Sequence, residues 1–320
     1  MIHVEQQGSV LAIRMSRSFF GRPFWWTTAY WVDGLLIDTG PRFAARQLCQ
    51  ALHKLPVEKI VITHGHENQI GGLPTLIQQY PNAKVYAARR TVPLLQEPPI
   101  ASLPLYRQLL WGRPQPWGGP ITITDELADR IETNSYSFHV VETPGHTADH
   151  IALFEPTQRW LFSGDIYLHG HDDAWPAEAD LFGVICSLRT LAALHPERLF
   201  ASDGRISRTP LPELHGKIGS LVQRARDVAR LDALGLTPEE MVLHFFQKEP
   251  PIYFWTMGHY SALHLIAACR SYNALFMPVA TERDQRTASS QPLAKDEAED
   301  ASDSSSNWPI DWGDLSDSLR

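Results

Sequence analysis

The sequence predicts an α/β protein built in layers, and two patterns support this prediction. Through residues 1–208, short runs of β-branched and aromatic residues alternate with segments of helical spacing, as in folds whose sheets are covered by helices. Over residues 209–280 the helical pattern dominates. With 320 residues, 43% of them hydrophobic, the chain can bury a large core. We therefore expect a first domain at 1–208 and a helical region at 209–280 that packs on it.

The first part of this domain is predicted to alternate between strands and helices. Residues 2–38 are rich in β-branched and aromatic residues, which favour strands. Apolar residues at helical spacing follow, with Phe43, Leu48 and Leu52 as core candidates. The predicted strands are residues 10–13, 31–38, 59–62 and 83–86, and the predicted helices are residues 41–52 and 70–79.

The middle of the chain contains a proline-rich segment at residues 93–120, with Trp111 and Trp117. Because proline removes a backbone donor from a sheet, we expect this segment to form a lid or a pocket wall. Sheet strands are predicted again at residues 121–124, 137–141, 151–154 and 160–162.

The helical region has one clear start signal. Thr237 can act as an N-cap, since Pro238 follows it and Glu240 stands three residues after the cap. A further helix is predicted at residues 261–276. Its apolar face is expected to contain Leu263, Ile266, Ala267 and Leu275.

Residues 281–320 are predicted to form a disordered tail. They contain ten acidic and four basic residues, so they carry −6 of the total net charge of −8. Such a composition cannot bury enough apolar area to offset the entropy lost on ordering. Trp308 and Trp312 form an aromatic island in this tail, which is either solvated or a short docking motif for a protein partner.

The rest of the chain excludes several classes of function. It carries the other −2 of the net charge and has no basic stripe, which argues against a nucleic-acid partner. Cys49, Cys186 and Cys269 are odd in number and show no Cys-x-x-Cys spacing, which favours reduced thiols in the cytoplasm. No signal pattern and no run of 18 apolar residues is present, so neither secretion nor a membrane span is expected. We therefore expect a cytoplasmic protein with a small-molecule substrate.

The most informative motif is Thr-His-Gly-His-Glu-Asn-Gln-Ile-Gly-Gly at residues 63–72. It places His64 and His66 two residues apart just past an apolar run, so both rings can aim at one point, as a divalent ion such as zinc requires. His146 stands on a Pro-Gly turn, and Asp165 ends a further apolar strand. Three imidazoles leave one open position on tetrahedral zinc, where a water molecule can have its pKa lowered to about 7.

Four motifs occur in the order typical of the metallo-β-lactamase superfamily, and residues 10–205 resemble that family. Asp38-Thr39-Gly40 resembles the turn after the family's early strand pair. The His64 segment resembles its His-x-His-x-Asp-His metal motif, which is followed by Gly-Gly. His146 lies in a Thr-Pro-Gly-His element and Asp165 in a Ser-Gly-Asp element. The resemblance implies an αββα metallo-β-lactamase-like sandwich with a C-terminal helical appendage like that of glyoxalase-II-like members, where it helps to roof the site.

The resemblance also implies which residues hold metal. His64, His66 and His146 keep the family's first metal position, and Asp165 keeps the ligand that bridges to a second position. The second position is altered, because Asn68 and Gln69 replace the family's Asp and His. Asp203 stands where the family has its last metal-binding His.

These substitutions predict one tightly held ion, with a second site that is weak or absent. Asp165 and Asp203 would be the remaining ligands of that second site. Zinc is expected, although iron and manganese also accept histidine and carboxylate ligands. Asp165 and Asn68 are the candidate catalytic residues, but Asn68 cannot take up a proton near neutral pH.

Other side chains are candidates for the substrate pocket. His169 and His171 repeat the His-x-His spacing, and they supply either a substrate contact or an exposed loop. His259 either lines the pocket from the C-terminal helices or is a polar residue at a helix start. An aromatic wall, or alternatively core packing, is indicated by Trp25, Trp26, Trp111, Trp117 and Trp255.

The sequence therefore predicts a metal-dependent hydrolase of a thioester, a lactone or another ester. The alternative is a degenerate member of the family that binds a ligand or partner without turnover, because Asn68 and Gln69 replace usual ligands. A nuclease or phosphodiesterase is disfavoured by the lack of a basic surface.

Overall fold

The computed structural model describes residues 1–19, 22–124, 130–170 and 172–276. The chain divides into a compact unit at Met1–Met277 and a second unit at Pro278–Arg320. The tail with Trp308 and Trp312 lies outside the described residues, and so does His171. The domain boundary between residues 208 and 209 stays a prediction.

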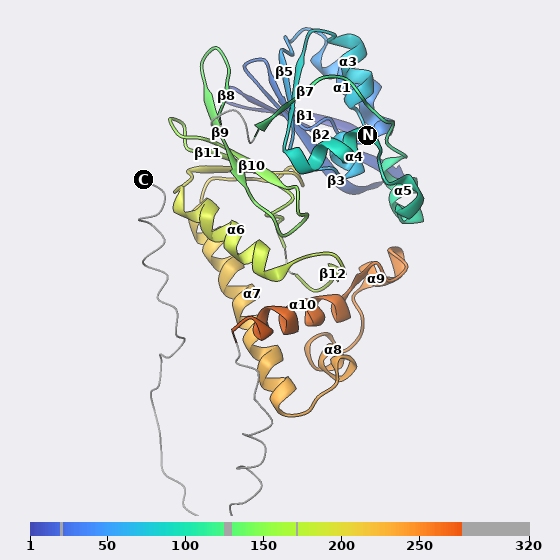
Figure 1. Ribbon diagram of the computed structural model, residues 1–320, viewed down its shortest axis with the longest axis vertical. Helices are drawn as coiled ribbons and strands as arrows, with labels where there is room; N and C mark the ends of the chain where they lie inside the picture. Colours follow the sequence, from blue (N-terminus) through green and yellow to red (C-terminus); the bar gives the residue numbers. More distant parts are fainter. Residues whose placement is uncertain (20–21, 125–129, 171, 277–320) are drawn as a thin grey trace, which may run out of the picture. The chain divides into compact units, whose positions relative to one another are not determined.

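Two sheets form the centre of the first unit (Figure 1). The larger sheet has the order β1-β2-β3-β4-β5-β6-β7, antiparallel from β1 to β4 and parallel from β4 to β7. Its strands are β1 (Ile2–Gln7), β2 (Val10–Phe19), β3 (Arg22–Val32), β4 (Leu35–Ile37), β5 (Lys59–Ile62), β6 (Lys84–Ala87) and β7 (Ile121–Ile123).

The smaller sheet has the order β14-β13-β11-β10-β9-β8. Its strands are β8 (Arg130–Glu132), β9 (Ser137–Glu142), β10 (Ile151–Glu155), β11 (Trp160–Gly164), β13 (Arg198–Ala201) and β14 (Ile206–Ser207). A short pair, β12 (Trp175–Pro176) and β15 (Tyr260–Ser261), joins the loop after β11 to the C-terminal helices.

Helices cover the outer face of each sheet. Between β4 and β7 of the larger sheet the chain forms η1 (Arg42–Ala44), α1 (Ala45–Leu52), α2 (Glu67–Ile70), α3 (Leu73–Gln79), η2 (Arg89–Thr91), α4 (Val92–Gln96), η3 (Ile100–Ser102) and α5 (Leu105–Trp111). Beside the smaller sheet, α6 (Leu181–Ala193) lies between β12 and β13. After β14 come α7 (Pro210–Ala233), α8 (Pro238–Phe246), α9 (Pro251–Trp255) and α10 (Ala262–Ala274).

Alternation along the strands explains the layers. In β5, Ile60 and Ile62 belong to the cluster shared with α1 and α3, whereas Val61 belongs to the cluster between the two sheets. In β11, Leu161 faces the cluster with α6 and α7, whereas Phe162 faces the other sheet. Successive side chains of a strand point to opposite faces, so each sheet is buried on both sides. This arrangement confirms the predicted αββα sandwich.

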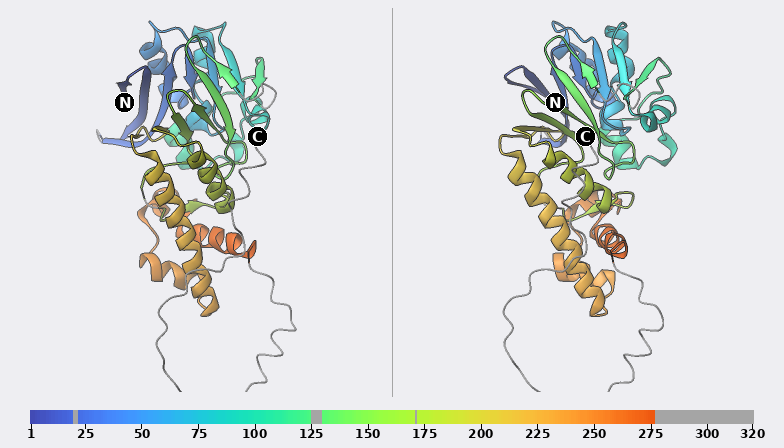
Figure 2. Two further views of the ribbon diagram at one scale, coloured as in Figure 1. Left: turned by 90° about the vertical axis from the view of Figure 1, so that its left-hand side faces the viewer. Right: turned by 60° about the vertical axis from the view of Figure 1, so that its left-hand side comes forward.

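The C-terminal helices pack around the long helix α7. Both views of Figure 2 show α8 and α10 beside α7, farther from the sheets than α6. Thr237 caps α8 as predicted, because its hydroxyl accepts from the Glu240 backbone N–H and the Glu240 carboxylate accepts from the Thr237 N–H. Among the described residues, no helix is both long enough and apolar enough to cross a membrane.

Replacing Thr237 with alanine is expected to lower the free energy of unfolding by about 1 kcal/mol, because the Glu240 backbone N–H loses the hydroxyl that caps it. Urea denaturation followed by circular dichroism measures this change. Ser220→Ala, at an exposed position inside α7, is the control and should change it by less than about 0.5 kcal/mol. Equal stability of the two variants would contradict the role of the cap.

The structure corrects several sequence predictions. The strand predicted at 31–38 is divided by a turn at Asp33 and Gly34, whose positive φ angles of 46° and 84° suit a two-residue hairpin. The helix α6 was missed, because it is apolar on almost every side and shows no clear period. Ala267 in α10 and Leu275, directly after that helix, are exposed, so their assignment to the apolar face is wrong. The buried face of α10 instead contains Ala262, Leu265, Ile266, Cys269 and Asn273.

Candidate metal centre

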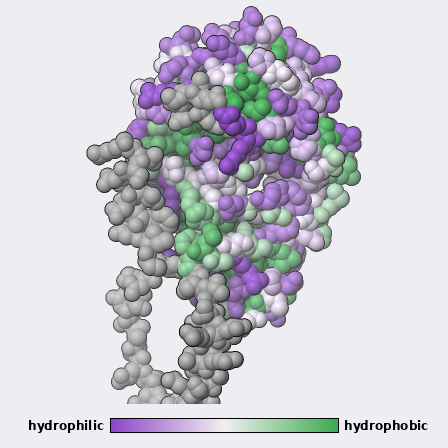
Figure 3. All heavy atoms as spheres, in the orientation of Figure 1, coloured by the Kyte–Doolittle hydropathy of each residue, from purple (hydrophilic) through white to green (hydrophobic). Residues whose placement is uncertain are grey.

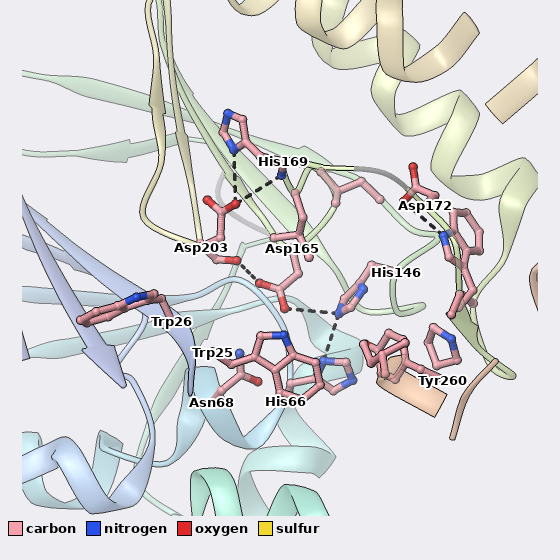
Figure 4. A pocket seen from close by; sticks show the side chains of 18 of the residues that line it. Trp25, Trp26, His66, Asn68, His146, Asp165, His169, Asp172, Asp203 and Tyr260 are labelled. Atoms are coloured by element: carbon pink, nitrogen blue, oxygen red, sulfur yellow. Dashed lines mark hydrogen bonds and ion pairs between the residues drawn. The ribbon is translucent and has the colours of Figure 1, made fainter. Parts of the chain in front are cut away.

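Loops at the ends of strands from both sheets bring four predicted site residues together. His64 and His66 follow β5, His146 lies just before β10, and Asp165 follows β11. One ligand atom from each of them lies within 4.8 Å of all the others. Figure 4 shows His66, His146 and Asp165 turned toward one another inside a cavity.

The distances within this group fit a shared cation. His66 Nδ1 lies 3.0 Å from His64 Nε2 and 3.1 Å from His146 Nε2. A neutral imidazole nitrogen has either one hydrogen or one lone pair, so ordinary hydrogen bonds satisfy two such neighbours poorly. Donor atoms around tetrahedral zinc lie about 3.3 Å apart, given bonds of about 2.0 Å. Asp165 Oδ2 completes the group, at 3.5 Å from His146 Nε2 and 3.7 Å from His64 Nε2.

The imidazoles are held in the form that binds metal. Burial, followed by the positive charges of neighbouring groups, lowers the pKa of His64 and His66 well below its usual value. Burial also lowers the pKa of His146, although the nearby Asp165 carboxylate opposes this shift. All three rings are therefore neutral near pH 7, which leaves a nitrogen lone pair free for a cation.

Local packing fixes the position of the motif at residues 63–72. Asp38 accepts hydrogen bonds from the Thr63 N–H at 2.8 Å and from its hydroxyl at 2.9 Å. Burial raises the pKa of Asp38 to about 8. Thr39 lies so close to Gly72 that a Cβ there would stand 2.2 Å from the Thr39 carbonyl oxygen. The Asp-Thr-Gly turn and the Gly-Gly pair therefore fit each other only without a side chain at residue 72.

His150 supports Asp165 and is not part of the four-residue group. Its Nε2 accepts from the Asp165 N–H at 3.1 Å, so its Nδ1 carries the hydrogen and donates to the Thr143 hydroxyl at 2.7 Å. Gly164 permits this contact, because a Cβ there would lie 2.6 Å from His150 Nε2. His150 thus orients the carboxylate through its backbone.

Hydrogen bonds occupy one carboxylate oxygen of Asp165. The Gln69 amide donates to Asp165 Oδ1 at 2.9 Å, and the Ser202 hydroxyl donates to the same oxygen. Asn68 lines the cavity, and its amide lies 3.5 Å from the Thr27 hydroxyl. Two donors therefore surround the carboxylate oxygen on the side where the resemblance implies a second cation. Sequence reasoning missed Ser202, whose only signal was its place directly before Asp203.

Asp203 lies outside the four-residue group. Its Oδ2 lies 3.3 Å from both the backbone nitrogen and Nδ1 of His169, while His169 Nε2 lies 3.4 Å from Glu213. His169 therefore stands between two carboxylates. Figure 4 shows one of these contacts, between His169 and Asp203. The role of Asp203 as a metal ligand stays a prediction.

Three of the four residues, His66, His146 and Asp165, line a cavity of about 390 Å³. Of the predicted aromatic wall, Trp25, Trp26 and Trp111 line it. Trp117 packs against the core beneath the larger sheet, and Trp255 is 67% exposed. His169 also lines the cavity. His259 lines a neighbouring cavity of about 420 Å³.

The proline-rich segment forms part of the wall, as predicted, through Tyr106, Arg107 and Trp111 of α5. The Tyr106 hydroxyl lies 2.7 Å from His259 Nδ1, and this hydrogen bond connects α5 to the segment between α9 and α10. Arg107 was not foreseen from the sequence. It forms a bidentate ion pair with buried Glu67, with distances of 2.6 and 2.7 Å.

Comparisons with known proteins identify the family of this chain. A family model described as the metallo-beta-lactamase superfamily matches residues 27–234. Hydroxyacylglutathione hydrolase of Legionella pneumophila (strain Lens) is 29% identical over 150 residues, which are 46% of this chain and 49% of that protein. Proteins of the same name from two other strains of this species match in the same way, so the chain spans about half the length of these curated relatives.

Two further similarities cover more of the chain. The beta-lactamase-like protein 2 homolog of Drosophila melanogaster is 26% identical over 245 residues, which are 72% of this chain and 76% of that protein. The crystal structure of a beta-lactamase domain protein from Burkholderia ambifaria has a TM-score of 0.64 at 18% identity, covering 86% of this chain and 88% of that one. At this identity the structural likeness concerns the fold alone.

Proposed function

Because the chain belongs to the metallo-β-lactamase superfamily, we propose that it is a metal-dependent hydrolase of thioesters, lactones or other esters. The convergence of three neutral imidazoles and one carboxylate on a single point carries this proposal. The similarity to proteins named hydroxyacylglutathione hydrolase favours a thioester among these substrates.

We further propose that one ion is bound tightly and that it is zinc. The three imidazole nitrogens are a donor set that catalytic zinc sites use, with one position left open for water, and Asp165 Oδ2 lies beside them. The hydrogen bonds from Gln69 and Ser202 to Asp165 Oδ1 support single occupancy, because they surround the oxygen that a second cation would need. Asn68 supplies no negative charge for a second ion.

When bound, such an ion supplies a water of pKa about 7 and polarises the substrate carbonyl. His64, His66 and His146 would hold it, and Asp165 would direct Oδ2 toward it while Oδ1 stays hydrogen-bonded. In the hydrolysis, the oxygen of water bonds to the acyl carbon and the carbon–sulfur or carbon–oxygen bond breaks. The leaving group takes up a proton, and the acid is released as its carboxylate.

Metal analysis and chelation test the proposal together. Protein purified without added metal is expected to contain about one transition-metal ion per chain. Removing that ion with a chelator should abolish hydrolysis in a panel of thioesters, lactones and aryl esters, and added zinc should restore it. Metal-free protein that still hydrolyses these substrates would overturn the proposal.

The alternative, binding without turnover, is favoured by one observation, the replacement of the second-position ligands by Asn68 and Gln69. Its signature would be one bound ion per chain with no hydrolysis of any member of the panel. The same measurements therefore decide between the two functions.

A further inference from the structure

We propose that the cavity beside the metal centre selects a neutral substrate with an aromatic or bulky apolar acyl group, and that it disfavours anionic conjugates. This inference rests on the proposed hydrolase function and names its substrate class. Two independent observations support it: an aromatic wall built by a β-bulge, and the pairing of the cationic side chains that line the cavity.

The bulge lies where β3 passes β2. Met15 pairs with Thr27 and Arg17 pairs with Phe24, so Trp25 and Trp26 both stand opposite the single residue Ser16. In a regular strand two consecutive side chains would point to opposite faces. Here both Trp25 and Trp26 line the cavity. Bulges commonly re-aim side chains in this way beside active sites.

The backbone of Trp25 is strained to achieve this. Its φ angle is 51°, in the left-handed region that bulky side chains rarely adopt. Strain of this kind is retained where the surrounding structure and function require it. Because a smaller residue would fit the same bulge more easily, the position of this large indole indicates a role in binding.

Trp25 is the centre of an aromatic wall. Its ring centre lies 6.2 Å from that of Tyr106 and 6.3 Å from that of Tyr260, and both tyrosines line the cavity. The wall continues to the surface through Phe24, whose ring lies 5.7 Å from that of Trp255. In Figure 3, apolar side chains gather at the level of α5 and α9, among hydrophilic neighbours. Aromatic rings at such spacings offer a large apolar surface to a ligand.

Tyr260 adds one polar group to this wall. Within the part of the chain that the structure describes, its hydroxyl has no hydrogen-bond partner, and the residue faces the cavity that contains His146 and Asp165. Burial raises the pKa of Tyr260 to about 12, so the hydroxyl keeps its proton. It can therefore donate to a neutral carbonyl oxygen of the substrate.

The charges of the cavity disfavour an anion. Among the described residues that line it, Arg107 and Lys217 are the arginine and lysine side chains. Arg107 is paired with Glu67, and Lys217 Nζ lies 2.7 Å from Asp172 Oδ2. The remaining charged lining groups include the acids Asp165 and Asp203. A substrate carboxylate that lies away from the metal centre would therefore lose water without gaining an unpaired cationic side chain.

A matched pair of thioesters tests the selectivity. S-phenylacetyl-N-acetylcysteamine is neutral, whereas S-phenylacetylglutathione has the same acyl group and a net negative charge. We expect kcat/KM to be about tenfold higher or more for the neutral thioester. Equal values, or a preference for the glutathione conjugate, would overturn the inference.

Trp25→Asn tests the wall, because asparagine tolerates the left-handed backbone and the variant should fold. We expect KM for the neutral phenylacetyl thioester to rise about tenfold, and KM for the matching acetyl thioester to change less. A loss of equal size for both acyl groups would show that the indole does not bind the acyl group.

Two charge variants test the pairing of Lys217. Asp172→Asn removes the carboxylate that neutralises the Lys217 ammonium group and should raise kcat/KM for the glutathione thioester up to about fivefold. Asp173→Asn removes the same charge from the exposed neighbouring residue, which does not line the cavity. We expect kcat/KM for the glutathione thioester to rise in Asp172→Asn but not in Asp173→Asn. An equal rise in both variants would contradict the inference.

Binding separates this inference from the hydrolase proposal. Amide analogues of the two thioesters, in which NH replaces sulfur, bind without turnover and can be titrated into the protein by calorimetry. Tighter binding of the neutral amide, together with no hydrolysis of either thioester, would refute the proposed hydrolase function and support the preference for neutral ligands. Equal binding of both amides would refute the preference for neutral ligands, whether or not the thioesters are hydrolysed.

Discussion

Replacing His66 with alanine is expected to weaken metal binding by about 10²- to 10³-fold. Structural zinc sites with four protein ligands bind the ion with about 10–16 kcal/mol, and we expect one histidine ligand here to contribute about a quarter of such a free energy. His66 is the most informative ligand to remove, because its Nδ1 lies within 3.1 Å of a nitrogen from each of the other two histidines. Competition with a chromophoric chelator measures the change in affinity.

The matched control for this variant is His53→Ala, which removes an exposed histidine at the end of α1, outside the four-residue group. We expect it to retain the metal affinity of the parent protein. Hydrolysis at limiting metal should fall with the affinity in the His66 variant and stay constant in the control. Metal affinity that is unchanged by the His66 substitution would contradict the proposed site.

The double variant Asn68→Asp, Gln69→His is expected to bind two ions per chain where the parent binds one. Histidine at residue 69 removes the amide that donates to Asp165 Oδ1 and supplies an imidazole. Aspartate at residue 68 adds the negative charge that the second position lacks. Elemental analysis of protein dialysed against zinc measures the number of ions.

A control with the same residue types is Gln78→His with Asn82→Asp, at exposed positions in and after α3. It should still hold one ion. Two tightly bound ions in the parent protein would refute the single-ion proposal, and one ion in the double variant would show that more than these two residues blocks the second position. If hydrolysis arises only in the double variant, the natural protein binds its ligand without turnover.

The site was predictable where its residues are close in sequence. His64 and His66 share one loop, so their spacing alone indicates that they can reach one ion. Strands such as β5 and β11 were predicted because each is a short apolar run, although nothing in such a run tells which partner lies on either face. The helix α6 was missed for a related reason, since an apolar surface on nearly every side has no period to detect.

The contacts around Asp165 could not be predicted in the same way. Gln69 and Ser202 are 96 and 37 residues from Asp165, and only the packing of the two sheets brings their donors to the same oxygen. The aromatic wall is similar, because the bulge at Trp25 depends on the pairing of β2 with β3. Five tryptophans were candidates from the sequence, and the fold placed three of them on the cavity.

The sequence by itself determined the layered fold, the histidine loop and the loss of the usual residues at 68 and 69, because local spacing and side-chain chemistry encode these features. The tertiary structure decided which donors surround Asp165 Oδ1, which cationic side chains are paired and which aromatic rings line the cavity. These depend on atoms that approach to about 3 Å across loops far apart in the chain, and a hydrogen bond or an ion pair exists only at such a distance.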